Sequence, residues 1–227
     1  MFTEFINLIF PNRCRSCEKN LFKGEYLICT FCRFKLPRTN FHQIPDNPLV
    51  KHFWGKTQIT NAAAYFYFNK GSRVQHLIHL LKYKGEKDLG VLLGNLFGSV
   101  LHTAENFRTI DYLIPVPLHA SRRKQRGYNQ SEIIVDGMHE TMHVPAIKNL
   151  LIRERATATQ TRKKRYSRYE NMKEVFVINN NSKYEGKHFL LVDDVITTGS
   201  TLVACAEKLH EIKNVKVSVA AIAYAHH

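Results

Sequence analysis

Apolar residues along the chain follow two alternating patterns: short continuous runs, and longer stretches in which they recur every three or four positions. Short runs of branched apolar residues are typical of strands that are buried on both faces of a parallel sheet. They predict strands at residues 62–68, 112–116, 150–153, 175–178, 188–192 and 215–223.

The longer stretches predict helices that bury one face. Their apolar stripes consist of Val74, Leu77, Ile78 and Leu81; of Leu89, Leu92, Leu93, Leu96, Phe97 and Val100; of Ile133, Ile134 and Met138; and of Leu202, Ala206 and Leu209. Because the strands alternate with these helices, the sequence predicts an α/β domain with a parallel sheet and right-handed crossovers.

Two segments before the first strand do not follow this alternation. Residues 1–10 are apolar and predict a docking helix that Pro11 would end. Because the segment contains Glu4 and lacks a basic start and a small-residue cleavage site, a signal peptide is not expected. Residues 38–55 contain prolines and asparagines without periodicity, which indicates a connector. We therefore divide the chain into a front segment at 1–37, a connector at 38–55 and the α/β domain at 56–227.

The predicted strand at 188–192 leads into two adjacent carboxylates, Asp193 and Asp194. Open α/β sheets bind ligands at the carboxyl ends of their strands. The loop that follows is rich in hydroxyl groups and consists of Ile196, Thr197, Thr198, Gly199, Ser200 and Thr201. Its hydroxyl and backbone N–H groups can bind a phosphate, together with the positive end of the next helix. The pattern predicts a site for a phosphorylated sugar.

An ordinary strand-to-helix turn is the alternative, in which Asp194 and Thr198 only cap the helix. Two adjacent acids at the end of an apolar strand repel each other, and a turn needs only one cap. A diol or a metal-bound ligand therefore accounts better for the pair.

Four cysteines near the amino end form two matched Cys-x-x-Cys units, Cys14 with Cys17 and Cys29 with Cys32. This spacing is typical of a tetrahedral Zn²⁺ site. Two disulfides are the alternative, which a reducing compartment disfavours. Four cysteines leave no position for water, so the predicted zinc is structural. Cys205 is expected to be buried in the core.

Two basic segments are further candidates for the site. After the strand at 112–116 the chain carries the donors His119, Ser121, Arg122, Arg123, Lys124 and Arg126. They suit a diphosphate at the same sheet edge as the acids, and a solvated charged helix start is the alternative. Residues 153–173 are polar and rich in Lys and Arg between two short strands, which predicts a long mobile loop.

Residues 188–201 resemble the phosphoribosyl pyrophosphate (PRPP) motif of type I phosphoribosyltransferases, in which a strand, two acids and a small apolar residue precede Thr-Thr-Gly-x-Thr. A wider resemblance is to the ComF family. It is carried by Ile114-Pro115-Val116-Pro117-Leu118-His119, Arg122, Arg126-Gly127-Tyr128-Asn129-Gln130-Ser131, Arg155, Thr157, Gln160, Arg168, Asn171, Phe176 and the four cysteines. The chain departs from the family at Tyr128, where Phe is commoner, and at Lys163, where an apolar residue is usual.

The resemblance implies an α/β fold of the type I phosphoribosyltransferase kind with a small zinc-ribbon-like module in front. It implies that Leu118, His119, Ala120, Ser121 and Arg122 cradle pyrophosphate. It also makes residues 153–173 a catalytic loop that closes over PRPP, with Gln160, Arg162, Lys163, Lys164 and Arg165 as the candidate residues. Mg²⁺ would be held by the diphosphate and the ribose hydroxyls, and an acceptor nitrogen that the sequence does not identify would take the phosphoribose.

The charge supports a second hypothesis, in which the chain handles single-stranded DNA and keeps the sugar-phosphate pocket as a sensor or a partial relic. The chain has 33 Lys and Arg against 19 Asp and Glu, a net charge of +14, which is enough for a polyanion footprint. Tyr128, Tyr166 and Tyr169 lie among the basic residues at 122–126 and 162–169 and could stack on unpaired bases. The resemblance agrees, because the ComF family is associated with uptake of single-stranded DNA in natural competence. Single-stranded DNA and competence proteins are therefore candidate partners.

The composition fits a cytoplasmic protein. Hydrophobic residues make up 44% of the chain, which is sufficient for a full α/β core. No segment is apolar over the length of a membrane span, so membrane insertion is not expected.

Overall fold

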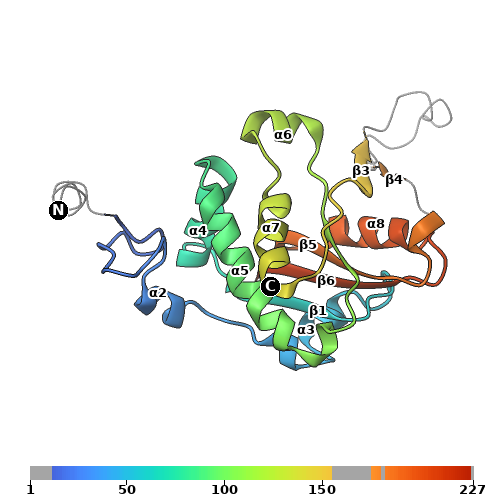
Figure 1. Ribbon diagram of the computed structural model, residues 1–227, viewed down its shortest axis with the longest axis horizontal. Helices are drawn as coiled ribbons and strands as arrows, with labels where there is room; N and C mark the ends of the chain where they lie inside the picture. Colours follow the sequence, from blue (N-terminus) through green and yellow to red (C-terminus); the bar gives the residue numbers. More distant parts are fainter. Residues whose placement is uncertain (1–11, 155–174, 180–181, 226–227) are drawn as a thin grey trace.

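The central sheet has four parallel strands in the order β1-β6-β5-β2 (Figure 1). The computed structural model describes residues 12–154, 175–179 and 182–225. The strands are β1 (Ala62–Phe68), β2 (Tyr112–Pro115), β5 (His188–Ile196) and β6 (Lys216–Ala225), and every neighbouring pair is parallel. The predicted α/β class and these four strands are confirmed. Strand β5 runs past the two acids to Ile196, so Asp193 and Asp194 lie within the strand.

Helices cover both faces of this sheet. One face packs on α4 (Arg73–Tyr83), α5 (Lys87–Thr103) and α7 (Gln130–Met142), and the other on α3 (Pro48–His52) and α8 (Ser200–Leu209). Side chains of β5 alternate between the two cores: Leu190 and Val192 face the first, Phe189 and Leu191 the second. This alternation follows from the period of two along a strand, and it explains why the strand is apolar throughout.

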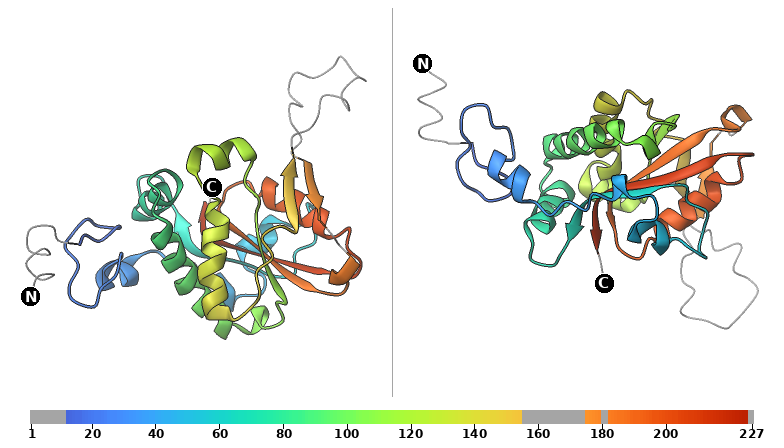
Figure 2. Two further views of the ribbon diagram at one scale, coloured as in Figure 1. Left: turned by 45° about the horizontal axis from the view of Figure 1, so that its top comes forward. Right: turned by 90° about the horizontal axis from the view of Figure 1, so that it is seen from below.

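Helices α5 and α7 lie side by side (Figure 2). Gly90, Gly94 and Gly98 of α5 are buried, and a Cβ atom added at Gly94 would meet the backbone of Ile134 and Gly137 on α7. The apolar stripe predicted on α5 therefore lies to one side of the face that packs most closely on α7. Its members Leu92, Leu96 and Val100 are only partly buried, because the face of closest approach is made of glycines.

The strands predicted at 150–153 and 175–178 are present as β3 (Leu151–Glu154) and β4 (Val175–Ile178), but they do not join the parallel sheet. They pair with each other in antiparallel register, Leu151 opposite Ile178 and Glu154 opposite Val175. The prediction of one parallel sheet was wrong for these two strands.

The front of the chain contains the short helix α2 (Thr30–Lys35), followed by the 3-10 helix η1 (Phe41–Gln43) and α3. The segment predicted as a connector packs on the sheet, because the buried side chains of Phe41, Leu49, Val50 and Phe53 belong to the second core. Two further 3-10 turns are η2 (Glu105–Phe107) and η4 (Ser182–Tyr184). Among the described residues, no helix combines the length and the apolar character that crossing a membrane requires. The docking helix predicted at 1–10 lies outside the described residues.

Candidate functional site

Two helices and the backbone of β5 itself hold the two acids of β5. Asp193 Oδ1 accepts hydrogen bonds from Ser131 Oγ of α7, at 3.2 Å, and from the backbone N–H of Asp194, at 2.8 Å. Asp194 Oδ1 lies 2.8 Å from Lys82 Nζ, at the end of α4. Asn129 places Ser131, because its side chain caps α7 through the N–H of Ser131 and donates to the Val116 carbonyl after β2. The pair is thus fixed before any ligand binds.

Burial and the neighbouring charge of Asp194 raise the pKa of Asp193 to about 7, against the opposing effects of the Asp194 amide, Lys82 and Ser131. The side chain of Asp194 is 10% exposed. Near neutral pH Asp193 is therefore only partly ionised. This is the arrangement that accepts hydrogen bonds from a diol or binds a cationic centre.

The loop after β5 turns sharply into α8. Gly199 has φ +72°, in the left-handed region that glycine adopts without strain, and it is the N-cap of α8. Because glycine has no side chain, Gly199 cannot cap the helix itself. The first amides of a helix have no intrahelical acceptor, and the Ser200 N–H makes a long hydrogen bond of 3.5 Å to Thr198 Oγ1. Thr198 Oγ1 and Ser200 Oγ lie 2.7 Å apart beside these amides. Asp194 does not cap α8, so the alternative of an ordinary capped turn does not hold for this residue.

Helix α3 holds this loop from below. The Nε2–H of His52 donates to the Thr198 carbonyl at 2.8 Å, and a Cβ atom at Gly199 would lie 3.2 Å from both His52 and Phe53. The sequence analysis missed His52, because nothing in the local pattern of residues 38–55 relates it to a loop 146 positions away.

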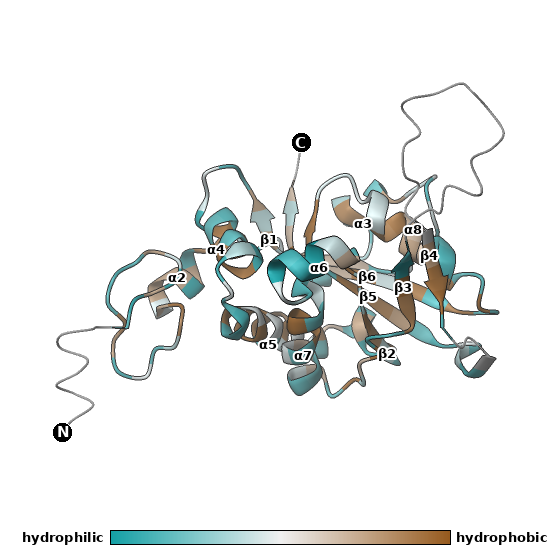
Figure 3. Cartoon of the chain, turned by 90° about the horizontal axis from the view of Figure 1, so that it is seen from above, coloured by the Kyte–Doolittle hydropathy of each residue, from teal (hydrophilic) through white to brown (hydrophobic). Residues whose placement is uncertain are grey.

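The predicted pyrophosphate loop is the start of a short polar helix. Helix α6 (Ala120–Arg126) begins directly after Leu118 and His119, and the His119 side chain caps it by accepting from the Ser121 N–H at 3.2 Å. The helix is almost entirely hydrophilic (Figures 1 and 3), and its Arg122 and Arg126 line the same cavity as the two acids. Ala120, Ser121 and Arg122 form the first turn of this helix, and Leu118 and His119 precede it.

A cavity of about 300 Å³ opens between these elements. Asp193, Asp194 and Thr201 line one side, and four cations line it as well: Lys82 of α4, Arg122 and Arg126 of α6, and Arg153 of β3. The Nε of Arg126 is buried without a hydrogen-bond partner among the described residues, although its Nη1 donates to Gln130 at 2.8 Å. A cavity with two acids beside a phosphate-type loop and four cations suits a ligand that has both hydroxyl and phosphate groups.

The catalytic-loop candidates Gln160, Arg162, Lys163, Lys164 and Arg165 lie outside the described residues. Lys82 was missed by the sequence analysis. It lies one residue after the apolar stripe predicted at 74–81 and 112 positions before Asp194, so only the folded chain brings the two together.

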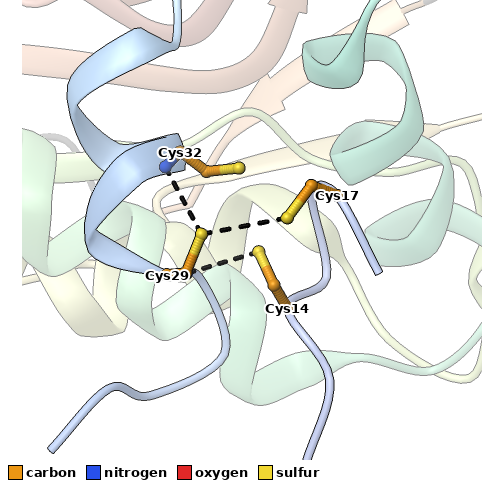
Figure 4. Close-up of side chains that lie close together, drawn as sticks. All are labelled: Cys14, Cys17, Cys29 and Cys32. Carbon is orange, nitrogen blue, oxygen red and sulfur yellow. Dashed lines mark hydrogen bonds between the residues drawn. The ribbon is translucent and has the colours of Figure 1, made fainter. Parts of the chain in front are cut away.

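The four cysteines lie together at the front of the molecule (Figure 4). Their Sγ atoms are all within 4.8 Å of one another, and those of Cys17 and Cys29 are 3.8 Å apart. Zn–S bonds of about 2.3 Å in a tetrahedron place the sulfur atoms about 3.8 Å apart. Cys14 Sγ accepts N–H groups from Cys29 at 3.3 Å and Ser16 at 3.4 Å. Burial opposes ionisation of Cys14, but these amide bonds outweigh it and lower its pKa to about 7. The cluster suits a metal that binds four thiolates.

Comparison with known proteins agrees with this geometry. The family model of the phosphoribosyl transferase domain matches residues 128–227, which contain both acids and the loop before α8. DNA utilization protein YhgH of Escherichia coli (strain K12) is 28% identical over 217 residues, 89% of this chain and 92% of that protein. Competence protein ComFC of Bacillus subtilis (strain 168) is 26% identical over 84% of this chain and 81% of its own length. Competence protein F of Haemophilus influenzae (strain ATCC 51907 / DSM 11121 / KW20 / Rd) is 32% identical over half of each chain.

Over most of its length the chain is similar to DNA utilization and competence proteins. It joins a four-cysteine cluster to a segment, residues 128–227, that matches the phosphoribosyl transferase domain. Among solved structures, it is similar to a purine phosphoribosyltransferase from Pyrococcus horikoshii Ot3, with 15% identity, 61% of this chain and 80% of that chain covered, and a TM-score of 0.38.

Proposed function

We propose that this ComF-like chain binds PRPP, or a ribose 5-phosphate ligand, with Mg²⁺ at the cavity beside β5 and transfers the phosphoribose to an acceptor nitrogen. The observation that carries the proposal is the union of a carboxylate pair, an uncapped helix amino end and four cations around one cavity. Asp193 and Asp194 would accept hydrogen bonds from the ribose hydroxyls. The loop at Thr197 to Thr201 would bind the 5-phosphate through its hydroxyls and the first amides of α8.

The cations of the cavity have a separate task in this proposal. Arg122, Arg126 and Arg153 would bind the diphosphate and stabilise the charge that develops on it. The C1–O bond to pyrophosphate breaks and its electron pair leaves with pyrophosphate. The acceptor nitrogen then uses its lone pair to form the C1–N bond and releases a proton to solvent. The two acids offset the positive charge on the ribose during this step, and no protein nucleophile is needed.

The donor set indicates how Mg²⁺ would enter. Asp193 and Asp194 are the only acidic side chains in the described lining of the cavity, which also holds four cations, so the ion would be carried by the oxygens of the diphosphate and the ribose hydroxyls. When bound, it neutralises charge on the leaving pyrophosphate.

Titration calorimetry with PRPP and Mg²⁺ tests the binding. The double variant with Asp193→Asn and Asp194→Asn should lose measurable affinity, because each amide adds a donor where the ligand needs a pure acceptor. Asp136→Asn is the matched control. Asp136 is a residue of α7 that pairs with Lys148 and does not line the cavity. Unchanged affinity in the double variant would remove the acids from the site. Release of pyrophosphate during a screen of nitrogen acceptors would then identify the transfer reaction.

We propose further that the cysteine cluster holds one structural Zn²⁺ and that the boundaries at residues 37 and 55 separate this module and its connector from the transferase-type domain. The four thiols supply every ligand of a tetrahedral site, so the ion would stabilise the fold without reacting. The described cysteines form no disulfide, which supports a cytoplasmic location.

A second function, binding of single-stranded DNA, is favoured by one observation. Four aromatic side chains near the cysteine cluster are exposed to solvent: Phe22 by 81%, Tyr26 by 55%, Phe31 by 61% and Phe34 by 82%. The exposed lysines Lys19, Lys23 and Lys35 lie among them in the sequence. Aromatic rings and cations together bind unpaired bases and phosphates. The names of the relatives, which concern DNA utilization and competence, support the same proposal.

This second function has a test of its own. Replacing Phe31 and Phe34 by Ala should weaken binding of an oligonucleotide in filter assays, because stacking contributes about 1–3 kcal/mol per base. The dependence of binding on salt should stay the same, since no cation is lost. Trp54→Ala is the control, because Trp54 is 61% exposed but lies beside α3. Equal affinities of all three proteins would exclude the aromatic surface. The basic run at 122–126 offers fewer free cations for DNA phosphates than its sequence indicates, since Arg123 already pairs with Glu132 at 3.1 Å.

A further inference from the structure

We propose that Lys82 is a positioning residue of the candidate site, and that the cysteine module keeps Lys82 in place by holding helix α4. The inference rests on the proposed binding of a phosphorylated ribose. It extends that proposal by linking the ligand site to a metal cluster that provides none of its contacts.

The position of Lys82 carries the first step. Its Nζ is 2.8 Å from Asp194 Oδ1, and the two side chains are only 22% and 10% exposed. The adjacent carboxylates of Asp193 and Asp194 repel each other at this point of β5, and an ammonium group at hydrogen-bond distance offsets that repulsion. A lysine ammonium has three donors, so Lys82 can hold Asp194 and still donate to a ligand oxygen in the cavity that it lines.

The residues on both sides of Lys82 are contacted by residues of the segment 126–128. The hydroxyl of Tyr128 donates to the carbonyl of Leu81. The guanidinium of Arg126 lies 5.2 Å from the ring centre of Tyr83. Because the residues directly before and after Lys82 are held in this way, its side chain leaves α4 from a defined point.

The cysteine module contacts the start of α4 and the turn that joins α4 to α5. At the start of α4, Arg73 Nη1 lies 3.8 Å from Cys32 Sγ. Just beyond its end, Glu86 Oε1 forms an ion pair with Arg15 Nε at 2.9 Å. Between these contacts, Cys14, Ile28, Cys32 and Leu36 share one core with the buried face of α4, formed by Val74, Leu77, Ile78 and Leu81. The module is therefore a clamp on α4, and Lys82 is the side chain through which α4 reaches the acids.

This arrangement predicts a pH signature. The charged groups that line the cavity are Lys82 from α4, Arg122 and Arg126 from α6, Arg153 from β3, and the two acids of β5. Lys82 Nζ pairs with Asp194 at hydrogen-bond distance, and it lowers the pKa of Asp193. Without it the pair takes up a proton at higher pH, and a ligand that needs both carboxylates as acceptors binds well only in more alkaline solution.

The experiment uses the full-length, zinc-loaded protein and titrates PRPP with Mg²⁺ at several pH values on both sides of neutrality. Lys82→Met keeps the aliphatic stem and should weaken binding about tenfold or more at neutral pH, with the rise of affinity moved to higher pH. Lys82→Arg should restore part of the affinity and return the pH profile. Lys84→Met is the matched control, since Lys84 is exposed two residues further on, and it should bind as the wild type does.

A second variant tests the clamp. Glu86→Gln breaks the ion pair with Arg15 without touching a cysteine, and it should weaken PRPP binding while the zinc content stays the same. Combined with Lys82→Met it should add little, because both changes act through the same side chain. Wild-type affinity and pH profile in Lys82→Met would overturn the role of Lys82. Unchanged affinity in Glu86→Gln, or full additivity, would overturn the clamp. Failure of the wild type to bind PRPP or ribose 5-phosphate would instead refute the proposed function, and this inference with it.

Discussion

The close contact between α5 and α7 can be tested by mutation, because it requires glycine, which has no Cβ atom, at the positions where the helices meet. Gly94 lies where the two helices are closest. An alanine Cβ there would be well under 3.0 Å from the carbonyl oxygen of Ile134 and 3.1 Å from the Cα of Gly137. All of the nearest obstacles are backbone atoms, which cannot rotate away, so Gly94→Ala must push the helices apart.

The size of the effect follows from this geometry. Relief of the clash needs a separation of about 0.5–1 Å, and a gap of that size forfeits a quarter to a half of the dispersion energy of the atoms in contact. Overpacking of this kind costs about 1–3 kcal/mol or more. The higher helix propensity of alanine returns about 1 kcal/mol. We therefore expect a net destabilisation of about 2 kcal/mol, which lowers the Tm by about 4–8 °C for a domain of this size.

Urea unfolding followed by circular dichroism measures this difference. Ser99→Ala is the control on the same helix, since Ser99 is exposed, and it should stay within about 0.5 kcal/mol of the wild type. Gly90→Ala should cost less than Gly94→Ala, because its new Cβ meets only side-chain ends, Ile133 Cγ2 at 2.7 Å and Leu81 Cδ1 at 2.8 Å. Equal stability of Gly94→Ala and Ser99→Ala would refute the close approach of the helices.

Three further predictions concern the metal and the site. Purified protein should contain about one zinc per chain by elemental analysis, and Cys14→Ser should lose it; protein purified under reducing conditions without chelator that holds no zinc would contradict the cluster. Because the pKa of Asp193 is raised from 3.8 to about 7 in the folded state, the folded protein binds the extra proton in that window and stability should fall as pH rises through it. Asp193→Asn should therefore raise the free energy of unfolding above pH 7 by up to a few kcal/mol and flatten its pH dependence between pH 4 and pH 7, and an unchanged curve would show that the carboxyl has an ordinary pKa. Thr198→Val should weaken PRPP binding roughly tenfold through the phosphate without loss of stability, whereas equal binding would remove its hydroxyl from the site.

The elements that could be predicted from the sequence are those whose burial follows from their own apolar pattern. Strand β1 has the predicted bounds Ala62–Phe68, and the buried face of α4 is the predicted set Val74, Leu77, Ile78 and Leu81. A strand with apolar residues on both faces has few alternatives to the middle of a sheet, and a stripe at helical spacing has few alternatives to a core face. The four cysteines were equally well defined, because a metal site depends on spacing that is local in the sequence.

Other features were hidden because they depend on partners far along the chain. Helix α6 has no buried residue, so no apolar period could reveal it. The antiparallel pairing of β3 with β4 follows from which strands meet, and a run of four apolar or mixed residues does not encode that choice. His52 and Lys82 enter the site through contacts 146 and 112 positions away. Local pattern defines elements, and the site is assembled from their ends.

The energetics of β5 explain why its acids are best understood as a ligand site. Placing Asp193 and Asp194 next to each other at the end of a buried strand is unfavourable, and the fold offsets the cost only in part, with one lysine, one serine hydroxyl and one backbone amide. Burial and, after it, the charge of Asp194 keep the pKa of Asp193 raised in spite of these three groups. Neither acid caps α8, because the N-cap is Gly199 and makes no side-chain hydrogen bond. The acids therefore do not offset their unfavourable energy by stabilising this helix. Hydroxyl groups of a bound ribose would supply the missing donors, and their binding free energy would include relief of the repulsion already present in the empty site.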